Sequence, residues 1–373
     1  MNTHSGQLLV INAGSSSLKL AVYEYISDHP AVLHDAVYSP FDISHAGDYL
    51  QDFISAHGRE HITTAIHRVV HGGKQLVQPC IIDTVVENEI ERLAALAPLH
   101  IPIALRLIRY CREYLGSNLP QIAVFDTAFF AHLPVVASTY ALPRDLLARH
   151  DIRRYGFHGI AHQAMWQRWC ELNPGYHGTG RVITLQLGGG SSMAAIRDGA
   201  PLDTSMGFSP LGGLVMSTRP GDVDPGLLIY LQEQEGLGPR QLDQLLNTQS
   251  GLLGLSGFTA DMRELLAGSS PAAQLAIDIY CYQIRKYIGA YLAVLGGADA
   301  VIFSGGIGLH AASIRRRILK DMSWCGVNLH EAANEMAIDR EHCISTEDSQ
   351  VAVWVMNVDE AAAMVRSGAH LFR

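Results

Sequence analysis

Two turns rich in glycine and serine, about half a chain apart, each separate a pair of apolar runs. The first is Gly14–Ser17 within VINAGSSSLKLAV, and the second is Gly188–Ser192 within TLQLGGGSSMAAI. One such turn is ordinary in a β-hairpin. Two turns in the same strand, turn, strand setting favour a duplicated α/β architecture, in which two similar halves face one another across a cleft.

The chain has 373 residues, of which 48% are apolar. At about 100–200 residues per domain, this length predicts two domains with cores of their own. Apolar runs that resemble strands alternate with helical stretches, which indicates mostly parallel or mixed sheets. A polar crossover at 143–154 predicts the boundary, with domains at 1–150 and 151–360. The stretch from about 361 to 373 is expected to be a helix that returns to the first domain.

The net charge of −9 argues against a nucleic-acid or anionic-membrane partner, so small-molecule substrates are expected. The six cysteines form no C-x-x-C pair, which predicts free thiols in a reducing compartment. No secretion signal precedes the first strand, so we expect a cytoplasmic protein. The most membrane-like stretch, 287–308, is interrupted by Asp299 and several glycines, which predicts a buried helix followed by a buried strand.

A third glycine cluster, with Gly305, Gly306 and Gly308, lies in VIFSGGIGLHAASIRRRIL between an apolar run and an amphipathic stretch. A strand, a glycine-rich loop and a helix N-terminus together present backbone N–H groups to an anion or nucleotide. The cluster fits neither Gly-x-Gly-x-x-Gly nor a Walker loop. A dinucleotide-binding dehydrogenase and a Walker NTPase are therefore disfavoured.

Histidine, arginine and aspartate gather among glycines in five short segments. These are HRVVHGG, APLHIP, VFDTAF, RRYGFHGIAH and STRPGDVDPG. Arginine supplies a fixed fork of donors for phosphate or carboxylate, and glycine permits close backbone approach. Taken singly, Arg68, Arg219, His100 and His158 also suit structural ion pairs or satisfied buried histidines.

Taken together and in order, these segments resemble the acetate and propionate kinase family, the acetokinase branch of the sugar-kinase, Hsp70 and actin superfamily. The motifs are VINAGSSSLKL, HRVVHGG, APLH, VFDTAF, RRYGFHG, DTSMGFSPLGGL, STRPGDVDP, SGLLGLSGFTADMR and FSGGIG. The resemblance implies a duplicated ribonuclease-H-like fold with an active-site cleft between its domains. It implies reversible transfer of the ATP γ-phosphoryl group to acetate with Mg²⁺ or Mn²⁺. A homodimer is also implied, with nucleotide binding and dimerisation in the second domain.

The same resemblance implies roles for five catalytic side chains. Arg68 and Arg219 would bind the carboxylate and the phosphoryl group in transfer. His158 would stabilise the equatorial oxygens of that group, and His100 would help to place it. Asp126, at the end of a predicted strand, would orient Arg68 or serve the metal ion.

Cofactor and metal sites follow in the same way. Asn12 and the Ser15–Ser17 turn would face phosphate and Mg²⁺, and either Asp359 or Glu360 would complete the metal site. The residues implied in nucleotide binding are Lys19, Gly188, Gly189, Gly190, Asp261, Met262, Arg263, Gly305, Gly306 and Gly308.

The pocket for the acyl group would be formed by Val70, Leu99, Phe157 and Pro210. Propionate-preferring members of the family often carry a smaller residue at the position of Val70, so this valine points to acetate. Because one methylene is worth only about 1–3 kcal/mol, propionate should react less well rather than not at all. Plain strand packing explains a buried valine equally well.

Several positions depart from the family pattern. The second-domain phosphate loop usually begins His-Leu-Gly-Asn-Gly, whereas this chain has Gln186 to Gly190 as QLGGG. Lys74 replaces an acid, Leu309-His310 replaces Glu-Asn, and MNVDE at 356–360 replaces Pro-Thr-Asn-Glu-Glu. These changes affect the nucleotide and metal sides more than the acyl pocket.

The departures leave alternatives open. ATP binding could be weaker, another nucleotide or pyrophosphate could be the donor, or propionate could be the main acceptor. A different class of protein, a catalytically degenerate regulator that binds nucleotide or acyl phosphate, also fits the altered loops. Phosphorylation of a hydroxyl, with Asp126 as general base, is less favoured because the implied acceptor pocket is apolar.

Overall fold

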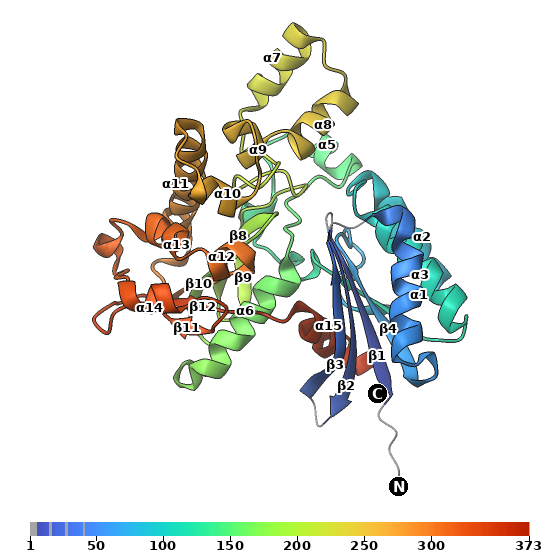
Figure 1. Cartoon of the computed structure of the whole chain (residues 1–373). Helices are drawn as coiled ribbons and strands as arrows, with labels where there is room; N and C mark the ends of the chain where they lie inside the picture. Colours follow the sequence, from blue (N-terminus) through green and yellow to red (C-terminus); the bar gives the residue numbers. More distant parts are fainter. Residues whose placement is uncertain (1–5, 15–16, 27–28, 40–41, 373) are drawn as a thin grey trace. The chain divides into compact units, whose positions relative to one another are not determined.

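The computed structural model describes residues 6–14, 17–26, 29–39 and 42–372, and the chain divides into two compact units. Unit 1 comprises the residues up to Ala131 together with Phe157–Ala161 and the stretch from Asp359 onward. Unit 2 comprises His132–Gly156 and His162–Val358. This division differs from the predicted boundary near 150, because contacts assign the segment after Ala131 to unit 2 and a later short segment to unit 1. Figure 1 traces the chain through both units.

Unit 1 is built on a six-stranded mixed sheet in the order β3-β2-β1-β4-β6-β5. Strand β1 runs antiparallel to β2 and parallel to β4, and β4 runs parallel to β6. The strands are β1 (Gln7–Ala13), β2 (Leu18–Ile26), β3 (His29–Tyr38), β4 (Ile62–Val69), β5 (Cys80–Ile81) and β6 (Gln121–Phe125).

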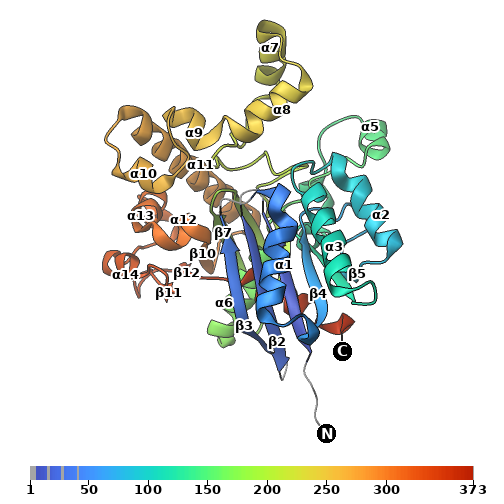
Figure 2. The ribbon, with the colours of Figure 1, turned by 45° about the vertical axis from the view of Figure 1, so that its right-hand side comes forward.

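Helices cover both faces of this sheet, with α1 and α3 on one face and α15 on the other (Figures 1 and 2). Alternation along β1 explains the arrangement, since Leu9 and Ile11 pack into the core shared with α1 and α3. Asn12, one residue further along, therefore points to the α15 face. The unit 1 helices are α1 (Ala46–His57), α2 (Thr84–Arg92), α3 (Ile101–Leu115) and α15 (Glu360–Gly368).

Unit 2 repeats this topology. Its sheet has the order β11-β12-β10-β7-β8-β9, and β7 runs antiparallel to β8 and parallel to β10. Read from the opposite edge, each strand has the neighbours and directions of its counterpart in unit 1. The predicted duplicated ribonuclease-H-like fold is confirmed by this match. The strands are β7 (Arg181–Leu187), β8 (Ser191–Arg197), β9 (Ala200–Thr204), β10 (Ala300–Ser304), β11 (His342–Cys343) and β12 (Ala352–Val355).

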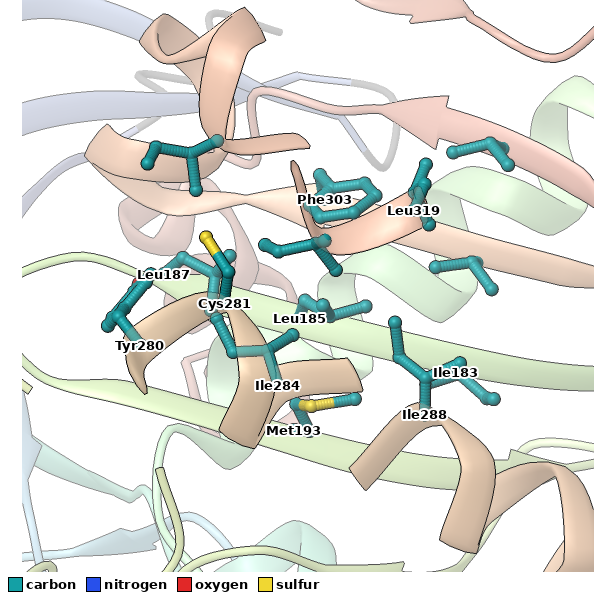
Figure 3. Close-up of a cluster of buried hydrophobic side chains, with 14 of the residues drawn as sticks. Ile183, Leu185, Leu187, Met193, Tyr280, Cys281, Ile284, Ile288, Phe303 and Leu319 are labelled. Carbon is teal, nitrogen blue, oxygen red and sulfur yellow. The ribbon is translucent and has the colours of Figure 1, made fainter. Parts of the chain in front are cut away.

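The core of unit 2 lies between this sheet and the long helix α11 (Pro271–Leu295). Figure 3 shows Ile183, Leu185 and Leu187 of β7 packed against Ile284 and other side chains of α11. The other unit 2 helices are α4 (Val135–Ser138), α5 (Arg144–Arg149), α7 (Pro225–Glu235), α8 (Pro239–Thr248), α9 (Gly251–Ser256), α10 (Met262–Ala267), α12 (Gly305–His310), α13 (Ala312–Leu319) and α14 (Glu331–Met336). Helix α6 (Gly159–Leu172) begins in unit 1 and continues in unit 2.

The helices and strands predicted from the sequence are present in the structure, but some of them end at other residues. The helical pattern over 84–96 forms α2 to Arg92 and continues as a 3₁₀ turn, Leu93–Ala95. The stretch 287–308 contains the end of α11, then β10 and the start of α12. No helix in the described ranges is both long enough and apolar enough to cross a bilayer.

Candidate active site

Three polar side chains stand at the carboxyl ends of three neighbouring parallel strands in unit 1. Asn12 lies near the end of β1, Arg68 lies near the end of β4, and Asp126 directly follows β6. The ends of these strands meet at one edge of the sheet, the edge at which open α/β sheets bind their ligands. Asn12 and Asp126 are only 4% and 1% exposed. The fold therefore brings together three residues that the sequence singled out.

Arg68 is held in place by both of these neighbours. Its Nε donates to the two carboxylate oxygens of Asp126 at 3.0 and 3.1 Å, and its Nη2 donates to Oδ2 at 2.5 Å. Its Nη1 donates to Oδ1 of Asn12 at 3.0 Å. Burial opposes the charged form, but the charges of Asp126 and Glu360 and the hydrogen bonds outweigh it and raise the pKa of Arg68. The guanidinium is thus a fixed cation in a defined orientation.

Glu360, the first residue of α15, reaches the same cluster. Its Oε2 accepts a hydrogen bond from Nδ2 of Asn12 at 3.0 Å. Asp359 is engaged elsewhere, because its Oδ1 accepts from the backbone N–H of Ala362 at 2.9 Å and its Oδ2 accepts from the Tyr23 hydroxyl at 2.7 Å. Of the two carboxylates between which the sequence could not choose, Glu360 is therefore the one that contacts Asn12.

Lys19 is placed beside Asn12 by the register of the sheet. The two residues are direct partners across β1 and β2, and side chains of directly opposite residues project on the same face. Lys19 is exposed. Gly14 closes the intervening turn by donating its N–H to the Ser17 carbonyl at 2.8 Å. Ser15 and Ser16, also implied in phosphate binding, lie outside the described residues.

The segment Phe157–Ala161 passes directly against the end of β6. The Gly159 N–H donates to the carbonyl of Asp126 at 2.9 Å, and a Cβ at this glycine would lie 2.2 Å from that oxygen. Glycine is therefore required at this contact. The preceding residue, His158, has a φ of +58°, in the left-handed region that residues with a side chain adopt uncommonly. The backbone of His158 therefore lies one residue away from the contact between Gly159 and Asp126.

The four residues predicted to line the acyl pocket belong to both units. Val70, Leu99 and Phe157 are in unit 1, whereas Pro210 is in unit 2. Val70 and Phe157 are 6% and 1% exposed, and Leu99 is 46% exposed. His100 follows Leu99 directly and precedes the first turn of α3. The structure thus supplies buried and exposed apolar groups, but their common pocket stays a prediction.

Unit 2 carries a glycine turn and a glycine-rich first helical turn at the equivalent edge of its sheet, because α12 begins at Gly305 with no loop after β10. Gly188–Gly190 follows β7, Gly305 follows β10, and these two strands are parallel neighbours. The turns lie side by side, because a Cβ on Gly188 would lie 4.0 Å from the backbone nitrogen of Gly306. Gly305 has a φ of +77°, and a Cβ there would lie 2.5 Å from a carbonyl oxygen of β7. The turns present backbone rather than side chains, which suits phosphate oxygens.

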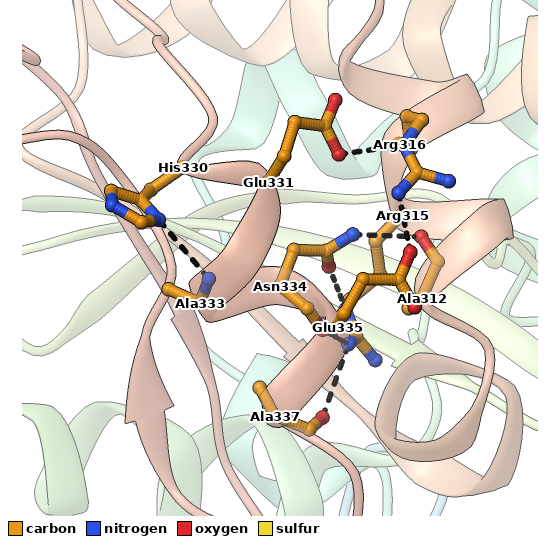
Figure 4. Close-up of polar contacts among 9 residues, drawn as sticks. All are labelled: Ala312, Arg315, Arg316, His330, Glu331, Ala333, Asn334, Glu335 and Ala337. Atoms are coloured by element: carbon orange, nitrogen blue, oxygen red, sulfur yellow. Dashed lines mark hydrogen bonds and ion pairs between the residues drawn. The ribbon is translucent and has the colours of Figure 1, made fainter.

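A buried arginine that the sequence analysis did not single out holds the far end of α12. Arg315 of α13 is fully buried and donates to the carbonyls of Gly308 at 2.7 Å and Leu309 at 3.0 Å. It also donates to the carbonyls of Asn334 at 2.7 Å and Ala337 at 3.1 Å (Figure 4). Burial lowers the pKa of Arg315 to about 10, so it stays charged at neutral pH. Carbonyls at helix ends, which carry partial negative charge, stabilise it.

The predicted adenosine-binding segment is organised around a helix cap. Asp261 precedes α10 and accepts from the backbone N–H of Arg263 at 2.8 Å. The Arg263 guanidinium pairs with the same carboxylate at 2.5 Å, although its side chain is 90% exposed. The hydrogen bonds from Arg263 lower the pKa of Asp261. Met262 is 5% exposed and packs into the core of unit 2, so its side chain anchors the start of α10 to that core.

Arg219 differs from Arg68 in having no acidic partner within the described part of the chain. Its Nη1 donates to the carbonyl of Pro210 at 2.7 Å. Burial lowers the pKa of Arg219 to about 10, which leaves it cationic at neutral pH. Asp222, three residues later, accepts from the Gly213 N–H at 2.7 Å and the Tyr287 hydroxyl at 2.5 Å, which anchors this loop to α11. A half-buried cation paired with a carbonyl is suited to receive an anion.

The metal site implied by the resemblance would use few protein ligands. The structure brings no three His, Cys, Asp or Glu residues together as a metal-binding group in the ranges it describes. Mg²⁺ commonly keeps several waters and takes one or two carboxylates together with substrate phosphates. The Glu360 carboxylate, which accepts from Nδ2 of Asn12 at 3.0 Å, fits that chemistry. The amide of Asn12 would ligate the ion through Oδ1, which here accepts from Nη1 of Arg68 at 3.0 Å.

Comparisons of the sequence and the fold with known proteins identify similar kinases. A model of the acetokinase family matches residues 42–366. A curated acetate kinase from Chloroherpeton thalassium is 47% identical over 312 residues, which are 82% of this chain and 75% of that protein. The crystal structure of Porphyromonas gingivalis acetate kinase has a TM-score of 0.88 at 34% identity, covering 99% of this chain and 100% of that one. A propionate kinase structure from Francisella tularensis has a TM-score of 0.86 at 33% identity, covering 97% and 98%.

Proposed function

Because the chain belongs to the acetokinase family, we propose that it is an acetate kinase that transfers the ATP γ-phosphoryl group reversibly to acetate, giving acetyl phosphate and ADP. The observation that carries this proposal is the cluster at the carboxyl edge of the unit 1 sheet. There Arg68 is fixed by Asp126 and Asn12, with Glu360 on the other side of Asn12. Such a cluster provides positioning and charge stabilisation, which dominate catalysis of phosphoryl transfer.

Phosphoryl transfer to acetate requires cations in the active site rather than a general base. Acetate has a pKa near 4 to 5 and is ionised at neutral pH, so no proton has to be removed before it attacks phosphorus. The difficulty is repulsion between the carboxylate and the phosphates. Arg68 and Arg219 would bind the carboxylate and the phosphoryl group and oppose this repulsion. His158 would donate to the equatorial oxygens, and His100 would help to orient the transferring group.

We assign the metal to Glu360 and Asn12. When bound, Mg²⁺, or Mn²⁺ in its place, would neutralise charge on the phosphate oxygens. Asp126 is oriented toward Arg68 by three hydrogen-bond contacts, which supports an orienting role for this carboxylate over a metal-binding one.

We assign ATP to the glycine turns of unit 2. Backbone N–H groups of Gly188–Gly190 and of the first turn of α12, from Gly305 to Gly308, would hold phosphates, and the segment Asp261–Arg263 would hold adenosine. Lys19 of unit 1 is exposed and would contribute charge toward the phosphates. Gln186 keeps a side-chain N–H donor where the family usually has histidine, whereas Gly189 removes the donor that asparagine would supply. This loss favours testing phosphoryl donors besides ATP.

The test is a hydroxamate assay, in which hydroxylamine traps acyl phosphate. Purified protein is incubated with Mg²⁺ and each pairing of acetate, propionate or butyrate with ATP, GTP or pyrophosphate. Product with acetate and ATP is expected. Product only with another donor would revise the donor, and no product with any pairing, while nucleotide still binds, would replace the kinase proposal with a binding role.

We propose that Val70 tunes acyl-chain length. Val70→Ala is expected to raise the ratio of kcat/KM for propionate to that for acetate about tenfold, since a methylene is worth about 1–3 kcal/mol in such a pocket. The matched control is Val69→Ala, because Val69 is fully buried in the core on the opposite face of β4. An unchanged ratio in Val70→Ala would assign this residue to packing alone.

We also propose a homodimer. Helix α7 has no buried residue, and it exposes Leu227, Ile229 and Tyr230 by 47%, 57% and 57%. Apolar side chains gathered on an exposed helix are typical of surfaces that another chain covers. Light scattering after gel filtration is expected to give the mass of two chains, and Ile229→Asp is expected to weaken the association. A single-chain mass for the unaltered protein at micromolar concentration would refute the dimer.

We place the enzyme in the cytoplasm. Its proposed co-substrate is ATP, and its six cysteines are all unpaired, as in proteins of reducing compartments. Cell fractionation that finds the protein in a membrane or secreted fraction would contradict this assignment.

A further inference from the structure

A tyrosine on β2 is tied to the start of α15. Tyr23 is 3% exposed, and its hydroxyl donates to Oδ2 of Asp359 at 2.7 Å. Burial and then the neighbouring carboxylate raise the pKa of Tyr23, so the hydroxyl stays protonated and remains a donor. The contact joins residues far apart in sequence within unit 1.

Asp359 links Tyr23 to the first turn of α15. Its other oxygen, Oδ1, accepts from the backbone N–H of Ala362 at 2.9 Å, which is the N-cap contact of α15. The carboxylate thus binds β2 through one oxygen and the first turn of α15 through the other. Glu360 lies in that first turn, and its Oε2 meets Nδ2 of Asn12 at 3.0 Å.

We propose that Tyr23 and Asp359 are positioning residues that hold Glu360 against Asn12 and so set the affinity of the site for its divalent cation. The inference rests on the proposed function, which supplies the cation. Tyr23 and Asp359 touch neither cation nor substrate in this scheme. Partners that orient metal ligands typically contribute about 10–100-fold in metal affinity, and partners one step further away contribute less.

Four substitutions separate positioning from direct ligation. Tyr23→Phe removes the hydroxyl and keeps the ring. Asp359→Ala removes both contacts, whereas Asp359→Asn keeps a capping oxygen and a polar partner for Tyr23 but removes the charge. Glu360→Gln removes the charge of the proposed ligand itself. The matched control is Tyr38→Phe, because the Tyr38 side chain has no hydrogen bond among the described residues and packs against the α1 side of the sheet.

The first readout is Mn²⁺ binding in the presence of ADP, followed by electron paramagnetic resonance of the free ion, which needs no turnover. The second is the Mg²⁺ concentration that gives half the maximal rate. Tyr23→Phe and Asp359→Ala are expected to raise the dissociation constant for Mn²⁺ and the half-maximal Mg²⁺ concentration about three- to tenfold. Asp359→Asn and Tyr38→Phe are expected to stay within about twofold of the unaltered protein, and Glu360→Gln is expected to show the largest loss.

Two results would overturn the inference. Weakening by Asp359→Asn equal to that by Glu360→Gln would make Asp359 a ligand, and unchanged Mn²⁺ binding in Tyr23→Phe would remove the tyrosine from the scheme. Thermal unfolding of each variant identifies any loss of fold. Failure of the proposed function is separate, because it would appear as no acyl phosphate from the unaltered protein while Mn²⁺ binding could still be compared across the variants.

Discussion

Replacing Arg219 by alanine is expected to lower kcat for acetyl phosphate formation about 10³-fold while leaving the unfolding temperature nearly unchanged. Arginines that stabilise phosphoryl transfer contribute about 10³–10⁵ in rate. The fold should tolerate the loss because Arg219 has no acidic partner within the described residues, and the hydrogen bond it gives up is to the carbonyl of Pro210. Steady-state kinetics and thermal unfolding of the same preparation measure both effects.

Two further variants sharpen this result. Arg219→Lys keeps the charge but loses the planar fork, so an intermediate rate is expected. Arg240→Ala removes an exposed arginine of α8 and should leave the rate unchanged. Near-normal turnover in Arg219→Ala would exclude Arg219 from the mechanism.

Arg68→Ala is expected to reduce turnover by about 10³-fold or more and, unlike Arg219→Ala, to destabilise the protein as well. The reason is Asp126, which is 1% exposed and would lose the cation that contacts both of its oxygens. Breaking a buried ion pair from one side costs about 3–5 kcal/mol because the remaining charge is uncompensated. Urea unfolding gives the free energy, and the hydroxamate assay gives the rate.

The double variant Arg68→Ala, Asp126→Ala tests this reasoning. It should regain much of the stability that Arg68→Ala loses, because no buried charge is left unpaired, yet it should remain inactive. Equal destabilisation in both variants would show that packing of the Arg68 side chain, rather than charge on Asp126, accounts for the loss of stability.

Sequence patterns predicted the parts of the fold and site that are encoded locally. Apolar runs that end in a polar residue placed Asn12 and Asp126 at strand ends, and two similar turns predicted the duplicated topology. Arg68 could be singled out because charged residues flanked by apolar strand and glycine are unusual. These signals lie within a few residues of the groups they identify, so one sequence is enough to find them.

The rest depends on contacts between distant segments. The bond from Tyr23 to Asp359 spans 336 positions, and nothing in an apolar strand marks one tyrosine as a donor to a helix cap. The choice of Glu360 over its neighbour follows from the extended backbone of Asp359, which turns that residue into the N-cap of α15. Arg315 lies in a run of three arginines typical of a solvated helix face, and it is nevertheless fully buried.

The assembly of unit 1 from separated stretches of chain has a consequence for biosynthesis. On the ribosome, all strands of its sheet are made before unit 2, whereas α15, which covers one face of that sheet, is made after it. Ala362, Ala363, Met364 and Val365 of α15 are buried in the finished protein, so the growing chain carries an uncovered apolar surface throughout synthesis of unit 2. Glu360 arrives with that cover. A nascent chain therefore gains its proposed metal ligand only when α15 covers the sheet. We expect incomplete chains to be both prone to aggregation and inactive.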